Sequence, residues 1–359
     1  MGVAGISSLH TAMHPDILEP YQELEQKYAQ FVGSSYGVSC NSGTSALHLA
    51  LLGLGVVAGD EVIVPDFTMG SVAFAVSYCG ARPVFADVSL DDYGLDPLDF
   101  QKKITTQTKA VIVVHTYGRL AQVDKIIEIA HARGIKVIED ACEAQGAVYD
   151  SKADATCWSF YRNKIIAAEE GGMVTTHNLE FAQNIADLKN MAFGPKHDYF
   201  HERIGFNYRM PNAMAKLALV SLHKYADNAK ARRKVEHWYN IRMPYHLPCR
   251  QAVWFYDVCM SKKVLEVCPE ARDAFKPLST FPMYGAGKGL PNARALSRVL
   301  VLLPVRPDMT EKDVQRICSV VSRSLEGGEL DAGTTAEEST PERTRLKGGA
   351  YDRDRHAPA

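Results

Sequence analysis

The sequence predicts an α/β protein with a mostly parallel, doubly wound sheet and a smaller second domain. Short runs rich in β-branched residues alternate with helical stretches between residues 36 and 140. Strict alternation of this kind favours parallel strands joined by crossover helices. The length of 359 residues is too great for one ordinary core, so we expect two domains. Ligands of such sheets bind at the carboxyl ends of the strands.

Five apolar runs are the expected strands of the large domain. They cover residues 36–40, 61–65, 81–88, 109–115 and 136–140. Between them, residues 44–55, 69–80 and 123–134 carry apolar residues at helical spacing and end in glycine, which suits a helix C-cap. A long helix is expected over residues 212–239, and its KARRK run, residues 230–234, is predicted to form a solvated face.

Composition sets the expected domain boundaries. Residues 1–235 are predicted to form the large domain, and residues 236–326 a C-terminal α+β domain. The smaller domain is expected to end in a helix with Thr310 as N-cap and Asp313 at the capping-box position. Residues 327–359 are rich in Gly, Thr, Glu and Arg and nearly free of large aliphatic residues, so disorder is expected there.

Bulk composition excludes several classes of protein. A hydrophobic content of 46% and a formal net charge of −2 imply no affinity for nucleic acid or for an anionic membrane. No run of about 18 apolar residues occurs, and no signal peptide is recognisable. The eight cysteines lack the spacing of a zinc or disulfide framework. We expect a cytoplasmic protein with no metal site.

One lysine, Lys164, lies in the stretch SFYRNKIIAAEEGG, residues 159–172, among aromatic, aliphatic and small residues. An exposed edge strand would explain it, because lysines are usually solvated. A partly apolar pocket would instead make the amine available to form a Schiff base. The stretch alone leaves both interpretations open.

Other candidate residues follow expected strands. In NSGTSALHLAL, Gly43 and Thr44 lie in a turn that opens a helix, where backbone N–H groups and hydroxyls suit a phosphate. An ordinary helix N-cap explains the same residues. Asp140 ends a strand, where it could face a cationic ligand or cap a turn. Asn207, in IGFNYRMPN, is a ligand candidate or a turn residue.

The order of these features indicates pyridoxal 5′-phosphate. The turn and Ser159 would take the phosphate, Asp140 the ring nitrogen, and Lys164 the aldehyde. No single motif requires this cofactor, but together the four features supply what it needs.

The motifs CNSGTSALHLAL, GDEVIVPDFT, GARPVFADV, TKAVIVVHTYG, VIEDACEAQGA, SFYRNK with EGGMV, and YFHERIGFNYRM are similar to one family. The chain resembles the sugar aminotransferases of the DegT/DnrJ/EryC1/StrS family, and within it the perosamine-synthase-like members, from about residue 20 to about residue 325. The resemblance implies the aspartate-aminotransferase fold, a fold-type I pyridoxal-phosphate transferase.

The resemblance also implies roles for individual residues. Lys164 is expected to be the Schiff-base lysine, and Asp140 the partner of the pyridine nitrogen. Further cofactor contacts fall on Gly43, Thr44, Met69, Glu143, Ser159 and, from the second subunit of a homodimer with composite sites, Asn207. Tyr199, His201 and Arg272 are candidates for the substrate, with a surface position as the alternative for His201.

The implied reaction moves an amino group from an amino acid, glutamate by resemblance, to a nucleotide-linked keto sugar such as a 4-keto-6-deoxyhexose. Two departures from the family pattern leave alternatives open. Glu169 replaces a glycine near the cofactor, and Met69 replaces an aromatic residue that usually covers the ring. They motivate one alternative, an impaired member with a regulatory or binding role. A second alternative is an aminotransferase that acts on a non-sugar carbonyl substrate. The family's dehydratases have His in place of the lysine, so Lys164 argues against them.

Overall fold

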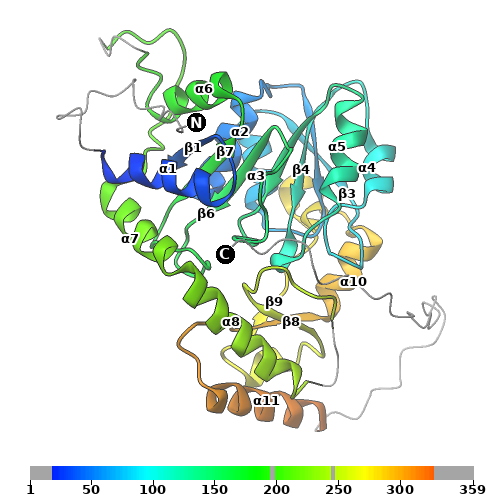
Figure 1. Ribbon diagram of the computed structural model, residues 1–359. Helices are drawn as coiled ribbons and strands as arrows, with labels where there is room; N and C mark the ends of the chain where they lie inside the picture. The colour runs from blue at the N-terminus through cyan, green and yellow to red at the C-terminus, as the bar shows by residue number, and fades with distance from the viewer. Residues whose placement is uncertain (1–17, 195–198, 244–246, 327–359) are drawn as a thin grey trace.

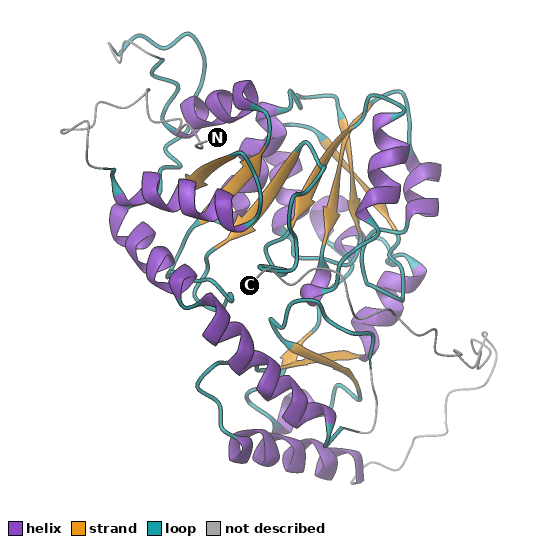
Figure 2. Ribbon diagram, in the orientation of Figure 1, coloured by secondary structure: helices purple, strands orange, loops and turns teal. Residues whose placement is uncertain are grey.

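The computed structural model describes residues 18–194, 199–243 and 247–326. A large part built on a seven-stranded sheet lies above a smaller part built on a three-stranded sheet (Figure 1, Figure 2). The segment 327–359, for which disorder is expected, lies outside the described residues.

The seven-stranded sheet has the strand order β1-β7-β6-β5-β4-β2-β3. Neighbouring strands from β6 to β3 pair in parallel, whereas β7 runs antiparallel to both β1 and β6. The mostly parallel sheet predicted from the sequence is therefore confirmed. Its strands are β1 (Tyr36–Cys40), β2 (Glu61–Pro65), β3 (Arg82–Ala86), β4 (Thr108–Val114), β5 (Lys136–Asp140), β6 (Ala155–Ser159) and β7 (Gly172–Thr176).

Helices cover both faces of this sheet because its central strands are apolar on both sides. In β4, Ile112 packs into a core with one set of helices, and its neighbours Val111 and Val113 pack into a core on the opposite face. The first core contains residues of α2 (Gly43–Gly53), α3 (Ser71–Tyr78) and α6 (Leu179–Lys189). The opposite face is covered by α4 (Pro97–Lys103), α5 (Val123–His131), α1 (Pro20–Phe31) and α7 (Asn212–His223).

The smaller part is an antiparallel sheet with the order β8-β10-β9. Its core joins Tyr239, Val258, Val301 and Ile317. Thr310 Oγ1 accepts from the Asp313 N–H (3.3 Å), and the Asp313 carboxylate accepts from the Thr310 N–H (2.8 Å), so the expected capping box is confirmed. The elements are α8 (Tyr225–Asn240), β8 (Tyr256–Cys259), α9 (Val264–Val267), β9 (Arg272–Asp273), α10 (Pro291–Val299), β10 (Leu300–Leu303) and α11 (Glu311–Glu326).

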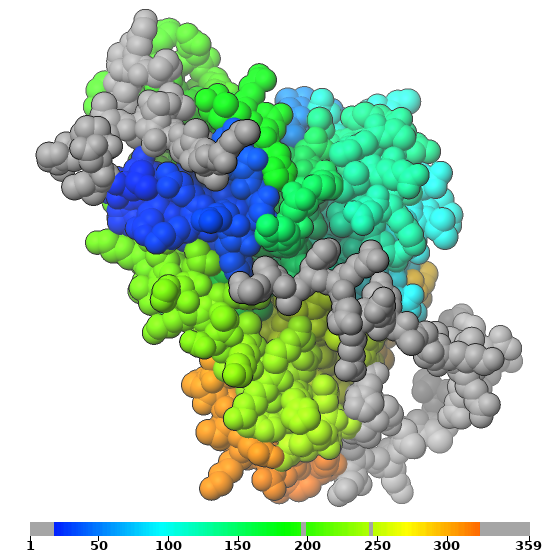
Figure 3. All heavy atoms as spheres, in the orientation of Figure 1, coloured from blue at the N-terminus to red at the C-terminus, as the bar shows by residue number. Residues whose placement is uncertain are grey.

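The helix predicted over residues 212–239 is two helices. Lys224 ends α7 and begins α8, and its ψ of 8° departs from helical geometry. Helix α7 packs along α1, which lies beside it on the surface (Figure 3). Helix α8 continues past the large sheet to pack against α11 (Figure 1). The expected domain boundary at residues 235 and 236 falls inside α8, and we propose that this helix bridges the two domains.

Within the described residues, no helix is long and apolar enough to cross a lipid bilayer.

Candidate functional site

The candidate site lies at the carboxyl ends of β1, β5 and β6. Strands β1 and β6 both run antiparallel to β7, so they point the same way as β5. Asp140 is the last residue of β5 and Ser159 the last of β6, and the turn at Ser42 follows β1. Parallel strand ends thus bring the predicted lysine loop, carboxylate and phosphate turn to one edge of the sheet.

Lys164 lies in the loop after β6 and is 9% exposed. Its backbone N–H donates to the Tyr161 carbonyl (2.8 Å), and its Nζ lies 3.6 Å from the centre of the Trp254 ring. Among the described residues, Nζ makes no ion pair or hydrogen bond. The exposed edge strand considered from the sequence is wrong, because β6 pairs with a strand on each side and Lys164 follows it into a buried loop.

Asp140 is 5% exposed and its Oδ1 accepts a hydrogen bond from the Cys142 N–H (3.0 Å). Burial raises the pKa of Asp140, while the hydrogen bonds from Cys142 and the positive charge of Lys164 act against that rise. A buried carboxylate of this kind is stabilised by a cation. A protonated pyridine nitrogen would be such a cation.

Glu143 lies one turn further along the same loop and is also buried. Its Oε2 accepts from the Tyr117 N–H at 2.7 Å. Burial raises the pKa of Glu143 to about 7, against the opposing charge of Lys164 and the bond from Tyr117. The site therefore holds a carboxyl group that can exchange a proton near neutral pH.

The turn before α2 has the geometry of an anion cradle. Ser42 Oγ caps the helix by accepting from the Ser45 N–H (3.1 Å), so the N-cap interpretation holds. The N–H groups of Gly43 and Thr44 precede the first intrahelical bond, from Ala46 to Ser42 (3.0 Å), which leaves them to face an anion.

Gly43 is required at this turn for a steric reason. A Cβ on Gly43 would lie 2.9 Å from the Ser159 Cβ and 3.2 Å from the Cys142 Sγ. Ser159 Oγ accepts from the Tyr161 N–H (3.3 Å), which leaves its hydroxyl proton to donate elsewhere. The donors present fit a phosphate group.

The two departures from the family pattern lie outside this buried cluster. Met69 is 56% exposed. Glu169 is also exposed, and its carbonyl accepts from the Arg162 N–H (3.3 Å). The Glu169 side chain therefore adds no buried charge beside Lys164.

The remaining candidate residues lie on the surface, and their observed contacts do not include Lys164. Asn207 is exposed next to Tyr208, whose carbonyl accepts from the Asn41 N–H (2.9 Å) just before the phosphate turn. His201 is exposed and its Nδ1 lies 2.8 Å from the Met191 carbonyl oxygen. Tyr199 is 79% exposed with its ring beside Phe193, and Arg272 lies 5.8 Å from the Phe255 ring.

Two residues of the site are missing from the sequence-based prediction. Trp254, whose ring meets Lys164, comes from the segment before β8 and has no local motif. Arg232 belongs to the KARRK run, and the prediction that this run is solvated is wrong for it, because Arg232 is 5% exposed. Helical spacing on α8 could have placed Arg232 with the buried Val235 and Glu236.

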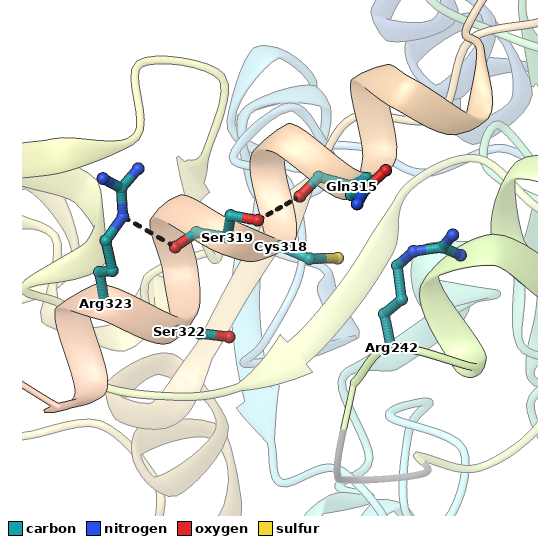
Figure 4. Close-up of a pocket in the computed structure, with 6 residues that line it drawn as sticks. All are labelled: Arg242, Gln315, Cys318, Ser319, Ser322 and Arg323. Atoms are coloured by element: carbon teal, nitrogen blue, oxygen red, sulfur yellow. Dashed lines mark hydrogen bonds between the residues drawn. The ribbon is translucent and has the colours of Figure 1, made fainter.

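A groove on the part built on the three-stranded sheet lies apart from this site. It opens between the end of α8 and α11 and is lined by residues that include Arg242, Cys318 and Arg323 (Figure 4). Arg242 is held by an ion pair with Glu311 at 2.5 Å. None of the residues that line the groove belongs to the candidate site around Lys164. Across the described residues, no group of three His, Cys, Asp or Glu side chains could hold a metal ion.

Comparison with known proteins gives consistent matches. The sequence profile of the DegT/DnrJ/EryC1/StrS aminotransferase family matches residues 18–248. The GDP-perosamine synthase of Caulobacter vibrioides is 35% identical over 331 residues, 84% of this chain and 89% of that protein. The UDP-N-acetyl-3-dehydro-alpha-D-glucosamine 3-aminotransferase of Acidithiobacillus ferrooxidans is 33% identical over 85% of this chain and 88% of that protein. The structure of S. venezuelae DesV in complex with a ketimine intermediate superposes with a TM-score of 0.78 at 28% identity, over 87% of this chain and 91% of that chain.

Proposed function

This chain belongs to the DegT/DnrJ/EryC1/StrS aminotransferase family, and from that premise we propose that it transfers an amino group from glutamate to a nucleotide-linked 4-keto-6-deoxyhexose. It is a pyridoxal-phosphate-dependent aminotransferase with the fold predicted from the sequence. The family resemblance stated from the motifs is confirmed. The sugar is proposed because GDP-perosamine synthases are among the relatives, although others are named for different nucleotide sugars.

One observation carries the proposal: a buried lysine without an ion-pair partner lies at the same sheet edge as two buried carboxyl groups, within the described chain. Lys164 would hold the cofactor through Nζ, and Asp140 would face its ring nitrogen. Gly43, Thr44 and Ser159 would hold its phosphate, with Glu143 beside the ring oxygen. When bound, pyridoxal 5′-phosphate supplies an aldehyde that takes up the amino group and a ring that accepts electrons.

The chain's own residues then control protons and solvent. Lys164, once freed by the amino donor, would move a proton with Nζ as general base and then as general acid. The Trp254 ring excludes water from one side of that amine, because it lies 3.6 Å from Nζ. Asp140 would keep its negative charge beside the ring nitrogen and so would favour the protonated form of that nitrogen.

The amino donor and the sugar are tested by one experiment. The full-length protein is incubated with pyridoxal phosphate, ¹⁵N-glutamate and a panel of nucleotide keto sugars, and products are identified by mass. We expect ¹⁵N in a 4-amino-4,6-dideoxy sugar nucleotide. Amination of free keto acids or simple aldehydes as fast as any nucleotide sugar would show that the sugar assignment is wrong.

We also propose a homodimer in which Asn207 of one subunit completes the phosphate site of the other. Asn207 is exposed, and α7 beside it exposes Leu217 (46%) and Val220 (56%), as expected for an interface. Tyr199, His201 and Arg272 are then proposed to contact the substrate, with the Arg272 cation facing its diphosphate.

Mixed subunits test the composite site. In a statistical mixture of Lys164→Ala and Asn207→Ala chains, half of the dimers pair one of each, and one of their two sites carries neither change. We expect about a quarter of wild-type activity from two nearly inactive proteins. A monomer in sedimentation equilibrium, or a mixture no more active than its parts, would contradict the proposal.

A further inference from the structure

Arg232 is a buried cation without a buried anion. It lies on α8 and is 5% exposed, yet among the described residues it has no carboxylate within ion-pair distance. Burial lowers the pKa of Arg232 to about 10, so the guanidinium remains charged at neutral pH. Taking such a group out of water is costly unless its donors are used.

Its two Nη groups donate to backbone carbonyls from three separate segments, whereas its Nε has no hydrogen-bond partner among the described residues. Nη1 donates to the carbonyls of Val305 (2.7 Å) and Trp254 (3.0 Å). Nη2 donates to the carbonyls of Asn163 and Lys164, each at 3.3 Å. One side chain thus joins the lysine loop, the segment that carries Trp254, and the strand-end loop after β10 of the smaller domain.

Two of these segments, the lysine loop and the segment that carries Trp254, also make contacts around the Lys164 amine. Trp254 Nε1 donates to the Asn163 carbonyl (3.1 Å), and the Trp254 ring lies over Lys164 Nζ. Arg232 therefore fixes both ends of this contact: the backbone that bears the amine and the backbone that bears the ring. Without the guanidinium, all four of these carbonyls would lose a charge-assisted bond.

We propose that Arg232 is a positioning residue that holds the Lys164 amine against Trp254 and ties it to the smaller domain. The inference rests on the proposed role of Lys164 as the cofactor lysine. The Arg232 guanidinium donates to backbone carbonyls and not to the Lys164 Nζ. Its effect on the chemistry therefore passes through the backbone of Lys164.

The neighbouring Arg233 provides a matched control. It lies on the same helix and also donates to two carbonyls, those of Arg250 (2.8 Å) and Gln251 (2.5 Å), but to neither Lys164 nor Trp254. Arg232→Met keeps the length and removes the donors. Arg232→Lys keeps the charge but cannot span four carbonyls. Arg233→Met removes an exposed arginine that bonds two other carbonyls and pairs with Glu236 at 3.0 Å.

Two measurements on the full-length protein distinguish a loss of Lys164 positioning from a general loss of stability. The first is the acetylation rate of Lys164 relative to Lys189 before cofactor is added. Lys189 is equally buried but ion-paired with Glu25 at 2.7 Å, so it reports any global loosening. The second is the pyridoxal phosphate concentration at which half of the chains are trapped at Lys164 by borohydride.

We expect Arg232→Met to raise the Lys164 to Lys189 acetylation ratio several-fold. The half-trapping concentration should rise about tenfold, a factor that corresponds to about 1.4 kcal/mol. Arg232→Lys should be intermediate and Arg233→Met unchanged. If Arg232→Met does not fold, the same two readings on Arg232→Lys carry the test.

Equal increases for both lysines, or no change in either reading, would overturn the inference while leaving the proposed function in place. If the wild-type protein is not trapped at Lys164, the proposed function fails and the inference with it.

Discussion

Two buried lysines beside the seven-stranded sheet differ in what surrounds their amines. Lys189, at the end of α6, pairs with Glu25 at 2.7 Å and donates to the Ser39 carbonyl at 2.8 Å. Among the described residues, the Lys164 Nζ has no ion pair or hydrogen bond; it lies 3.6 Å from the centre of the Trp254 ring, and its charge acts on Asp140 and Glu143 from a greater distance. Burial is similar for the two, with 6% and 9% of each residue exposed.

The difference separates a structural lysine from an available one. The Lys189 charge is compensated by a carboxylate, so its amine is committed to the fold. The Lys164 amine is held in position but bonded to nothing that must be displaced before it reacts. Burial of a lysine therefore does not by itself indicate chemistry, whereas burial without an ionic partner at a strand-end crevice does.

The largest expected effect is that of Lys164→Ala. Removing the amine should reduce transamination by roughly 10⁴-fold or more, because both the cofactor link and the proton transfer use Nζ. Turnover is measured with glutamate and the accepted keto sugar, and circular dichroism confirms the fold. Activity near that of the wild type would assign the chemistry to another residue.

Asp140→Asn should have the next largest effect. The amide oxygen can still accept the Cys142 N–H, so the loop is retained while the negative charge is lost. We expect turnover to fall by about 10²- to 10³-fold, as for other charges aimed at the reacting group. If the variant turned over within twofold of the wild type, Asp140 would be a structural turn residue only.

Lys189→Met should change stability and not chemistry. It leaves the Glu25 carboxylate, 15% exposed, without its cation, at a cost of roughly 3 kcal/mol in the free energy of unfolding. Denaturant unfolding measures this loss, and borohydride trapping at Lys164 should be unaffected. A large loss of trapping in folded protein would erase the distinction between the two lysines.

The smallest expected effect is a pH-dependent one at Glu143. A carboxyl pKa raised to about 7 in the folded chain means that this group favours folding below its ordinary pKa, near 4.5. That contribution is lost as the pH rises through about 7. Glu143→Gln should therefore raise the melting temperature of the cofactor-free protein at pH 8, by roughly 2–4 °C, and little at pH 5.

The exposed Glu169 gives the control for this pH effect, since Glu169→Gln should change the melting temperature equally little at both values. An equal gain at pH 5 and pH 8 for Glu143→Gln would mean that Glu143 does not titrate in this range.

The local patterns of the sequence predicted much of the large sheet. The runs at β1, β2 and β5 match the observed strands to the residue, because short apolar runs bounded by turn residues are typical of buried strands. Asp140 and the turn at Gly43 followed from the same patterns. Strands β6 and β7 were not predicted, and β7 is the antiparallel exception in the sheet.

Local sequence patterns could not predict the contacts between distant segments. The Trp254 ring meets Lys164 although 90 positions separate them in the sequence, and no motif marks that contact. The charge-rich KARRK run suggested solvent, yet Arg232 is buried because carbonyls from three other segments accept its donors. Local composition indicates whether a residue type prefers solvent. It does not show which distant backbone groups will satisfy that residue once the chain has folded.

The most direct test of the account is where the cofactor becomes attached. The wild-type chain is loaded with pyridoxal phosphate, reduced with borohydride and digested with trypsin. Trypsin cleaves after Arg162, Lys164 and Lys189, and a modified lysine is not cleaved. We predict a peptide of residues 163–189 that carries the pyridoxyl mass on Lys164. Modification of Lys189, of another lysine, or of none would contradict the central claim that Lys164 is the available amine of this enzyme.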